Sequence, residues 1–176
     1  YMIIVFTGNG KGKTTAALGQ AFRTLGREKR VLMIQFIKGP WRSGEDYFAE
    51  KFQIPNSKFQ IKKMGLGFVG ILGDQLPKER HAEAARAALA YSKEQIANSK
   101  WHLIILDEIN VATSLGLLTK EEVVEVLKTV PDEKFVILTG RGAPQEFIDR
   151  ADLVTEMKEI KHPFNDGKMA KIAMEF

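Results

Sequence analysis

Short apolar runs recur along the chain and alternate with longer segments whose apolar residues follow helical spacing. Buried strands are predicted at 2–6, 31–37, 103–106 and 135–139, and a further strand is predicted at 153–157. Weaker patterns predict a short, partly exposed strand at 58–62 and a last strand at 170–176. Helices are predicted at 13–25, 77–98, 119–130 and 144–150. Because helices connect successive strands, we expect the strands to run parallel.

The longest predicted helix begins at Pro77, a residue that suits a first helical turn. Its apolar stripe consists of Ala82, Ala85, Leu89, Ser92 and Ile96. His81 falls in the first turn without other metal-binding residues nearby, so we expect it at the surface. Thr119 followed by Glu122 predicts a capping box at the start of the next long helix.

Composition narrows the class of protein without naming it. The 176 residues, 44% hydrophobic and 27% charged, suit one globular domain spanning 1–176. The absence of cysteine excludes disulfides and thiolate-bound metals and fits a cytoplasmic location. No apolar run is long enough to cross a bilayer, and no signal peptide is visible. The net charge is +4, but the basic residues are scattered, so neither a membrane nor a nucleic acid is the expected partner.

The segment between the first strand and the first helix carries the strongest chemical signal. Glycines let consecutive backbone N–H groups point toward one anion, and the helix N-terminus adds a partial positive charge. A lysine and a hydroxyl at this place suit a triphosphate with its magnesium ion. The sequence therefore predicts a nucleotide phosphate loop formed by Gly8, Asn9, Gly10, Lys11, Gly12, Lys13, Thr14 and Thr15.

The loop departs from the usual pattern, in which four residues separate a first glycine from the Gly-Lys pair. Thr7 occupies the place of that first glycine, and Gly8 comes one position later. The loop is therefore either tighter than usual or holds its phosphates differently. A glycine-rich turn with a solvated lysine is the other interpretation, which the paired threonines and the strand–turn–helix context disfavour.

Two carboxylates, Asp107 and Glu108, follow the apolar run at 103–106. They are expected at the C-terminal end of a buried strand, beside the phosphate loop, where they can hold Mg²⁺ directly or through water. Asp107 could instead cap the following helix, whereas for Glu108 we favour magnesium binding.

Loops after three predicted strands add further candidates. Lys38 follows the strand at 31–37, and Arg141 lies between glycines after the strand at 135–139. Both are at C-terminal strand ends, where open parallel sheets bind ligands, although either could be a plain surface residue. The segment 64–73 is apolar yet rich in glycine. It is either a loop that lines a pocket for a large apolar ligand or a poorly packed connector.

Together these features predict an α/β fold of the phosphate-loop NTPase type, RecA-like, with a mostly parallel sheet flanked by helices. They predict binding of a nucleoside triphosphate with Mg²⁺ and leave the reaction open. The guanine-reading Asn-Lys-x-Asp motif is absent, and the chain is too short for a helicase with two motor domains. Neither a protein-kinase catalytic loop nor a nucleophile–base pair is visible.

The sequence resembles the ATP:corrinoid adenosyltransferases of the bacterial vitamin B12 pathway over nearly its whole length. The resemblance is carried by the segments 7–15, 35–39, 106–108, 139–142, 151–152 and 161–164. It implies ATP and a reduced corrinoid such as cob(I)alamin as substrates, with Mg²⁺ or Mn²⁺. Co(I) would attack the ribose 5′ carbon of ATP and triphosphate would leave, so no protein nucleophile is needed. The shortened phosphate loop is shared with the family, which binds ATP reversed relative to ordinary NTPases.

The resemblance also implies roles for particular residues. Lys13 and the loop amides would hold the triphosphate, and Arg23 on the first helix would reach the nucleotide. Thr14 and Glu108 would hold the metal ion, with Asp107 in support. Catalysis would then consist of orientation and charge stabilisation.

Reduction of the corrinoid is the second demand that the resemblance implies. Family members place aromatic side chains beneath the corrin, which displaces the lower cobalt ligand and eases reduction of Co(II). Phe68 stands in that place here, but the second aromatic of some relatives is replaced by Gly70. Lys38 and Arg141 are weaker candidates near the leaving group or the corrinoid.

A homodimer and an electron donor such as a flavodoxin or a flavin reductase are further implications of the resemblance. Relatives close the site with an N-terminal arm, whereas this sequence begins at its first strand. Three alternatives therefore stay open: the site is closed by another segment, by a partner subunit, or not at all. Two alternatives stay open: an ATPase of the same fold that acts on nucleic acid or as a switch, and a corrinoid carrier without catalytic activity.

Overall fold

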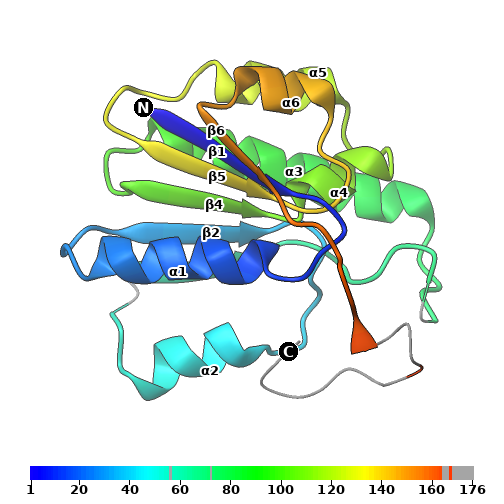
Figure 1. Cartoon of the computed structure of the whole chain (residues 1–176), viewed down its shortest axis with the longest axis horizontal. Helices are drawn as coiled ribbons and strands as arrows, with labels where there is room; N and C mark the ends of the chain where they lie inside the picture. The colour runs from blue at the N-terminus through cyan, green and yellow to red at the C-terminus, as the bar shows by residue number, and fades with distance from the viewer. Residues whose placement is uncertain (56, 72, 164–166, 168–176) are drawn as a thin grey trace.

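The computed structural model describes residues 1–55, 57–71, 73–163 and 167. In these residues six strands form one sheet with the spatial order β3-β2-β4-β5-β1-β6, and every neighbouring pair is parallel (Figure 1). The strands are β1 (Met2–Thr7), β2 (Val31–Gln35), β3 (Phe59–Lys63), β4 (Leu103–Asp107), β5 (Phe135–Thr139) and β6 (Leu153–Glu156). The loops that follow β1, β2, β4 and β5 therefore meet at one edge of the sheet.

Helices cover both faces of the sheet (Figure 1). One face carries α1 (Lys13–Leu25) and α2 (Gly44–Lys51). The opposite face carries α3 (Lys78–Ala97), α4 (Ile109–Ser114), α5 (Lys120–Leu127) and α6 (Gln145–Arg150). In the part of the chain that the structure describes, no helix is both long enough and apolar enough to cross a membrane.

The alternation of side chains along each strand divides the core into two halves. Ile3 and Val5 pack with the layer formed by α3 to α6, whereas Ile4 points to the α1 layer. Because both faces are covered, the central strands are apolar at nearly every position. This is why continuous apolar runs, rather than alternating ones, marked these strands in the sequence.

The prediction of an α/β fold with a mostly parallel sheet is confirmed, and the short strand expected near 58–62 is β3, which pairs with β2 at one edge. Two helices were not predicted. The first, α2, contains no fully buried residue and so lacks an apolar stripe, and the second, α4, has only six residues. The strand expected at 170–176 lies outside the described residues.

The prediction that His81 lies at the surface was wrong. Its side chain is buried, and its Nε2 lies 3.0 Å from Oδ2 of Asp74. The same carboxylate accepts hydrogen bonds from the backbone N–H groups of Gly70 and Leu76, at 2.8 and 3.0 Å. The loop before α3 therefore folds against the first turn of that helix, and the Asp74–His81 pair fastens it there.

Gly65 lies where this loop runs against the end of β2. Its N–H donates to the carbonyl of Gln35 at 3.0 Å, and an added Cβ would lie 2.3 Å from the carbonyl carbon of Ile37. We expect Gly65→Ala to lower the free energy of unfolding by about 2 kcal/mol, because backbone atoms would have to move. Urea denaturation measures the change.

Gly19 provides the matched control for this substitution. It lies within α1, and an added Cβ would meet nothing within 4 Å. Gly19→Ala is therefore expected to raise the free energy of unfolding by about 0.5–1 kcal/mol, through better helix propensity. Equal stability of the two variants would show that the close approach at Gly65 is relieved without cost.

Candidate nucleotide-binding site

The phosphate loop joins β1 to α1 and encloses its own lysine. The ammonium group of Lys13, the first residue of α1, donates to the carbonyl oxygens of Gly8 and Gly10 at 2.8 and 2.6 Å. Burial lowers the pKa of Lys13, an effect that the charge of Glu108 partly offsets. Gly12 precedes the helix with φ +116°, a conformation that suits glycine. The positive charge of Lys13 and the positive end of the helix dipole therefore lie together, and both favour a bound anion.

The chain that follows β6 supports the phosphate loop from outside. The N–H of Met157 donates to the carbonyl of Thr7 at 2.8 Å, and the N–H of Gly10 donates to the carbonyl of Met157 at 2.6 Å. A Cβ at Gly8 or Gly10 would lie 2.5 or 2.7 Å from that Met157 oxygen. Glycine at these two positions therefore leaves room for the backbone of Met157 to pack against the loop. The Gly10 N–H, which was expected to donate to phosphate, donates to Met157 instead.

Thr7, which replaces the usual first glycine, has a structural use that glycine lacks. Its buried hydroxyl oxygen accepts a hydrogen bond from the N–H of Ala143 at 3.1 Å. This bond ties the end of β1 to the loop after β5, which also carries Arg141.

Asp107 is fully buried at the end of β4 and accepts several hydrogen bonds. The hydroxyls of Thr14 and Thr139 donate to its Oδ1, each at 2.8 Å, and the amide of Gln35 donates to its Oδ2 at 3.2 Å. Burial raises its pKa, and the charge of Lys38 and these hydroxyls oppose the rise. Asp107 does not cap α4, whose preceding residue is Glu108. Since Thr14 gives its proton to Asp107, the lone pairs of its oxygen stay available to a cation.

Glu108 is held in an unusual conformation that aims its side chain toward the cleft. Its backbone is left-handed, with φ 62°, and its N–H donates to Thr139 Oγ1 at 3.0 Å. Within the described residues, its buried Oε2 has no hydrogen-bond partner. Burial, together with the charge of Asp107, raises the pKa of Glu108 to about 7. Backbone strain and an unpartnered, buried carboxylate are both typical of functional positions, which makes Glu108 a candidate site residue.

Lys38 lies among three carboxylates at the end of β2. Its Nζ forms an ion pair with Glu45 Oε1 at 2.6 Å and lies 3.9 Å from Asp107 Oδ2. Burial alone would lower the pKa of Lys38, but the charges of Asp107, Glu45 and Glu108 raise it overall. The side chain is therefore a fixed positive charge beside the acid pair.

A cleft of about 730 Å³ opens above these groups. Most of the predicted site residues line it, namely Asn9, Gly10, Lys11, Gly12, Lys13, Thr14, Thr15, Lys38, Phe68, Glu108 and Arg141. Asp107 lies buried beneath the cleft, and Gly8 faces Met157. The cleft is also lined by four residues that were not predicted as site residues, Leu18, Gly44, Glu45 and His162, of which only His162 lies in a segment that carries the family resemblance.

Arg23 is the predicted site residue that the structure leaves apart from the others. It is exposed in the last turn of α1 and is not among the residues that line the cleft. Ten residues of helix, about 15 Å at 1.5 Å per residue, separate it from Lys13. A contact with the nucleotide would require a ligand that extends along α1.

The donor set fits a magnesium-type ion held jointly with phosphate. Among the described residues, no group of three or more His, Cys, Asp or Glu side chains could hold a metal by itself. The free lone pairs of Thr14 and the unpartnered oxygen of Glu108 provide hard oxygen ligands beside the phosphate loop. Mg²⁺ typically binds through one or two protein oxygens, with water and phosphate completing its octahedron.

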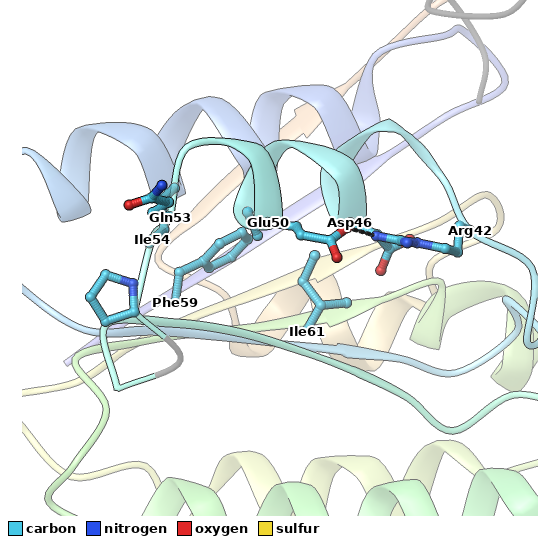
Figure 2. Close-up of a pocket in the computed structure, with 9 residues that line it drawn as sticks. Arg42, Asp46, Glu50, Gln53, Ile54, Phe59 and Ile61 are labelled. Carbon is cyan, nitrogen blue, oxygen red and sulfur yellow. Dashed lines mark hydrogen bonds and ion pairs between the residues drawn. The ribbon is translucent and has the colours of Figure 1, made fainter.

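A second hollow, of about 530 Å³, lies between α2 and β3 (Figure 2). Phe59 and Ile61 of β3 face the side chains of Asp46 and Glu50 from α2, and an ion pair joins Glu50 to Arg42. It shares no lining residue with the cleft and contains none of the predicted site residues. The phosphate loop and the acid pair therefore direct the functional assignment to the cleft.

These features define a nucleotide-binding protein of the phosphate-loop class. The sheet is parallel, a glycine-rich loop with a lysine follows its first strand, and an acid pair ends the strand two places away in the sheet. The flagellar accessory protein FlaH from Methanocaldococcus jannaschii has a similar fold, with a TM-score of 0.54, 12% identity and coverage of 88% of this chain and 70% of that one. Residues 1–176 match the family described as ATP:corrinoid adenosyltransferase BtuR/CobO/CobP, and the chain belongs to that family.

Curated relatives agree with this assignment. A corrinoid adenosyltransferase of Escherichia coli K12 is 39% identical over 175 residues, which cover 99% of this chain and 85% of the relative. Corrinoid adenosyltransferase CobA of Salmonella typhimurium is 37% identical with the same coverage. A corrinoid adenosyltransferase of Pseudomonas aeruginosa is 35% identical over 99% of this chain and 83% of its own length.

Proposed function

We propose that the protein transfers the 5′-deoxyadenosyl group of ATP to the cobalt of a reduced corrinoid and releases triphosphate. Membership of the family supports ATP and a corrinoid as substrates. The observation that carries the proposal is the position of Phe68, an exposed aromatic side chain that lines the same cleft as the phosphate loop. An apolar ring beside a phosphate site suits a reaction between a nucleotide and a large macrocycle.

In the proposed reaction, Co(I) supplies the electron pair of the new Co–C bond to the 5′ carbon of ATP. The C5′–O bond breaks, and its electrons leave with the triphosphate. Lys13 and the N–H groups at the start of α1 bind the triphosphate and stabilise its growing charge. Thr14 and Glu108, with Asp107 behind them, would hold Mg²⁺ or Mn²⁺, and the ion would supply positive charge to stabilise the leaving triphosphate.

The surrounding side chains orient the two substrates. Lys38 and Arg141 add positive charge to the lining of the cleft, to which Glu108 also belongs. Phe68 covers the lower face of the corrin, excludes the axial ligand and so favours reduction of Co(II). An electron donor such as a flavodoxin or a flavin reductase supplies the electron. We further propose that the protein is a homodimer and acts in the cytoplasm.

One assay distinguishes this function from its alternatives. The protein is supplied with ATP, Mg²⁺ and chemically reduced cobalamin, and the light-sensitive spectrum of adenosylcobalamin is followed together with the phosphate products. Adenosylcobalamin with triphosphate supports the proposal. ADP with phosphate would instead indicate an ATPase, and tight corrinoid binding without turnover would indicate a carrier.

Phe68→Ala tests the proposed role in reduction. We expect the rate from Co(II) with a reductant to fall about tenfold, since one aromatic contact contributes about 1–1.5 kcal/mol. The rate from chemically prepared Co(I) should change much less, because the lower ligand is already absent. Adenosylcobalamin formation measures both rates. Equal losses in the two assays would identify Phe68 as ordinary packing.

A further inference from the structure

An exposed aromatic pair borders the nucleotide cleft. Trp41, in the loop between β2 and α2, stacks on Phe68, in the loop after β3, with ring centroids 5.6 Å apart and planes inclined by 26°. The two side chains are 46% and 43% exposed. Aromatic side chains gain more from burial than most others, so two that lie side by side in solvent indicate a surface that a ligand covers.

The indole of Trp41 lies in a seat formed by two glycines. A Cβ at Gly39 would lie 2.7 Å from the indole ring, and a Cβ at Gly67 would lie 2.8 Å from it. The N–H of Gly67 donates to the carbonyl of Ile37 at 2.9 Å, which joins the two loops, and the ammonium group of Lys63 donates to the carbonyl of Trp41 at 2.5 Å. Backbone packing therefore sets the position of the indole.

A shallow hollow of about 330 Å³ lies beside the pair. Trp41, Leu66, Phe68 and Ile71 supply its apolar wall, and all four side chains are exposed. Phe68 lines both this hollow and the nucleotide cleft. A flat, largely apolar ligand on this wall would therefore lie next to the bound nucleotide.

We infer that Trp41 and Phe68 together form the platform for the lower face of the corrin ring, with Trp41 in the role of the second aromatic that is missing at Gly70. The inference rests on the proposed function. Two rings from two loops cover more of the macrocycle than one ring and exclude the lower cobalt ligand more completely. Trp41 thereby favours four-coordinate Co(II), which accepts one electron to become Co(I).

The test compares Trp41→Ala, Trp41→Phe and a control, Phe52→Ala, which removes another exposed aromatic side chain from the end of α2. Each variant is assayed for adenosylcobalamin formation from Co(I) and from Co(II) with reduced flavin. The electron paramagnetic resonance spectrum of Co(II) cobalamin, recorded with ATP and each protein, reports whether the cobalt is four-coordinate. ATP binding measured by calorimetry checks that the cleft is intact.

For Trp41→Ala, we expect about a tenfold loss from Co(II), a change below about threefold from Co(I), and loss of the four-coordinate signal. Trp41→Phe should retain most of the signal, and Phe52→Ala should behave as the wild type. Equal losses from Co(I) and Co(II), or an unchanged signal, would overturn the role of Trp41 while the proposed function stands. Absence of product from Co(I) with the wild-type protein would overturn both.

Discussion

Replacement of Lys13 by alanine is expected to lower the affinity for ATP by at least about 100-fold, since charge-assisted hydrogen bonds contribute about 1.5–3 kcal/mol each. Lys13 lies inside the phosphate loop, where its ammonium group already bonds to the carbonyls of Gly8 and Gly10. The substitution removes the charge that we propose faces the phosphates, and also the hydrogen bonds that hold the loop in shape. Calorimetric titration with ATP and Mg²⁺ measures the loss.

Lys11→Ala is the matched comparison, because Lys11 belongs to the same loop but has an exposed side chain. Its loss should cost less than about tenfold in affinity, as expected for a solvated charge. If the two variants bound ATP equally well, the phosphate loop would attract ATP through its net charge alone. The specific role of Lys13 would then be refuted.

Glu108→Gln is expected to lower the rate of adenosyl transfer from Co(I) by at least about 100-fold, because it replaces the proposed charged metal ligand by a weaker neutral one. The same change should stabilise the protein in the absence of ligands. Burial raises the folded-state pKa of Glu108 to about 7, above its usual value of 4.5. Glu108 therefore favours the folded state below about pH 4.5, and this contribution is lost as the pH rises through 7.

At pH 8 the rise in the pKa of Glu108 from 4.5 to about 7 corresponds to about 3 kcal/mol of unfavourable ionisation energy in the wild-type protein without ligands. In thermal unfolding at pH 5 and pH 8, Glu108→Gln should reduce the dependence of stability on pH. Glu94→Gln, at an exposed position, should leave that dependence unchanged. A metal ion requires the charged carboxylate, so metal–ATP binding should release a proton and weaken as the pH falls below 7. A variant as active as the wild type would refute metal binding by Glu108.

Several parts of the site could be predicted because local chemistry and topology point to the same place. The glycine-rich loop lies between a buried strand and a helix, and Asp107 and Glu108 end another buried strand. Parallel strands present their C-terminal ends at one edge, so the loop and the acids had to meet there. Lys38 and Arg141 followed from the same reasoning, and the structure brings both to the cleft.

The features that could not be predicted depend on contacts between distant segments. The bonds between the phosphate loop and Met157 involve residues far apart in sequence, and the loop glycines were attributed to anion binding alone. Trp41 stacks on Phe68 from another loop, and the composition of the two loops does not indicate which of their residues meet. Burial of His81 required knowledge of how the preceding loop folds back, and α2 lacks the apolar stripe by which helices are recognised.

The position of β1 between β5 and β6 has a consequence for the order in which the sheet can assemble. β1 pairs on one side with β5 and on the other with β6, and the phosphate loop after it is bonded to Met157. Both neighbours of β1 therefore lie far along the described chain, so β1 pairs only through contacts of high sequence separation, which form slowly. The phosphate loop likewise lacks its hydrogen bonds to Met157 until that residue has been made.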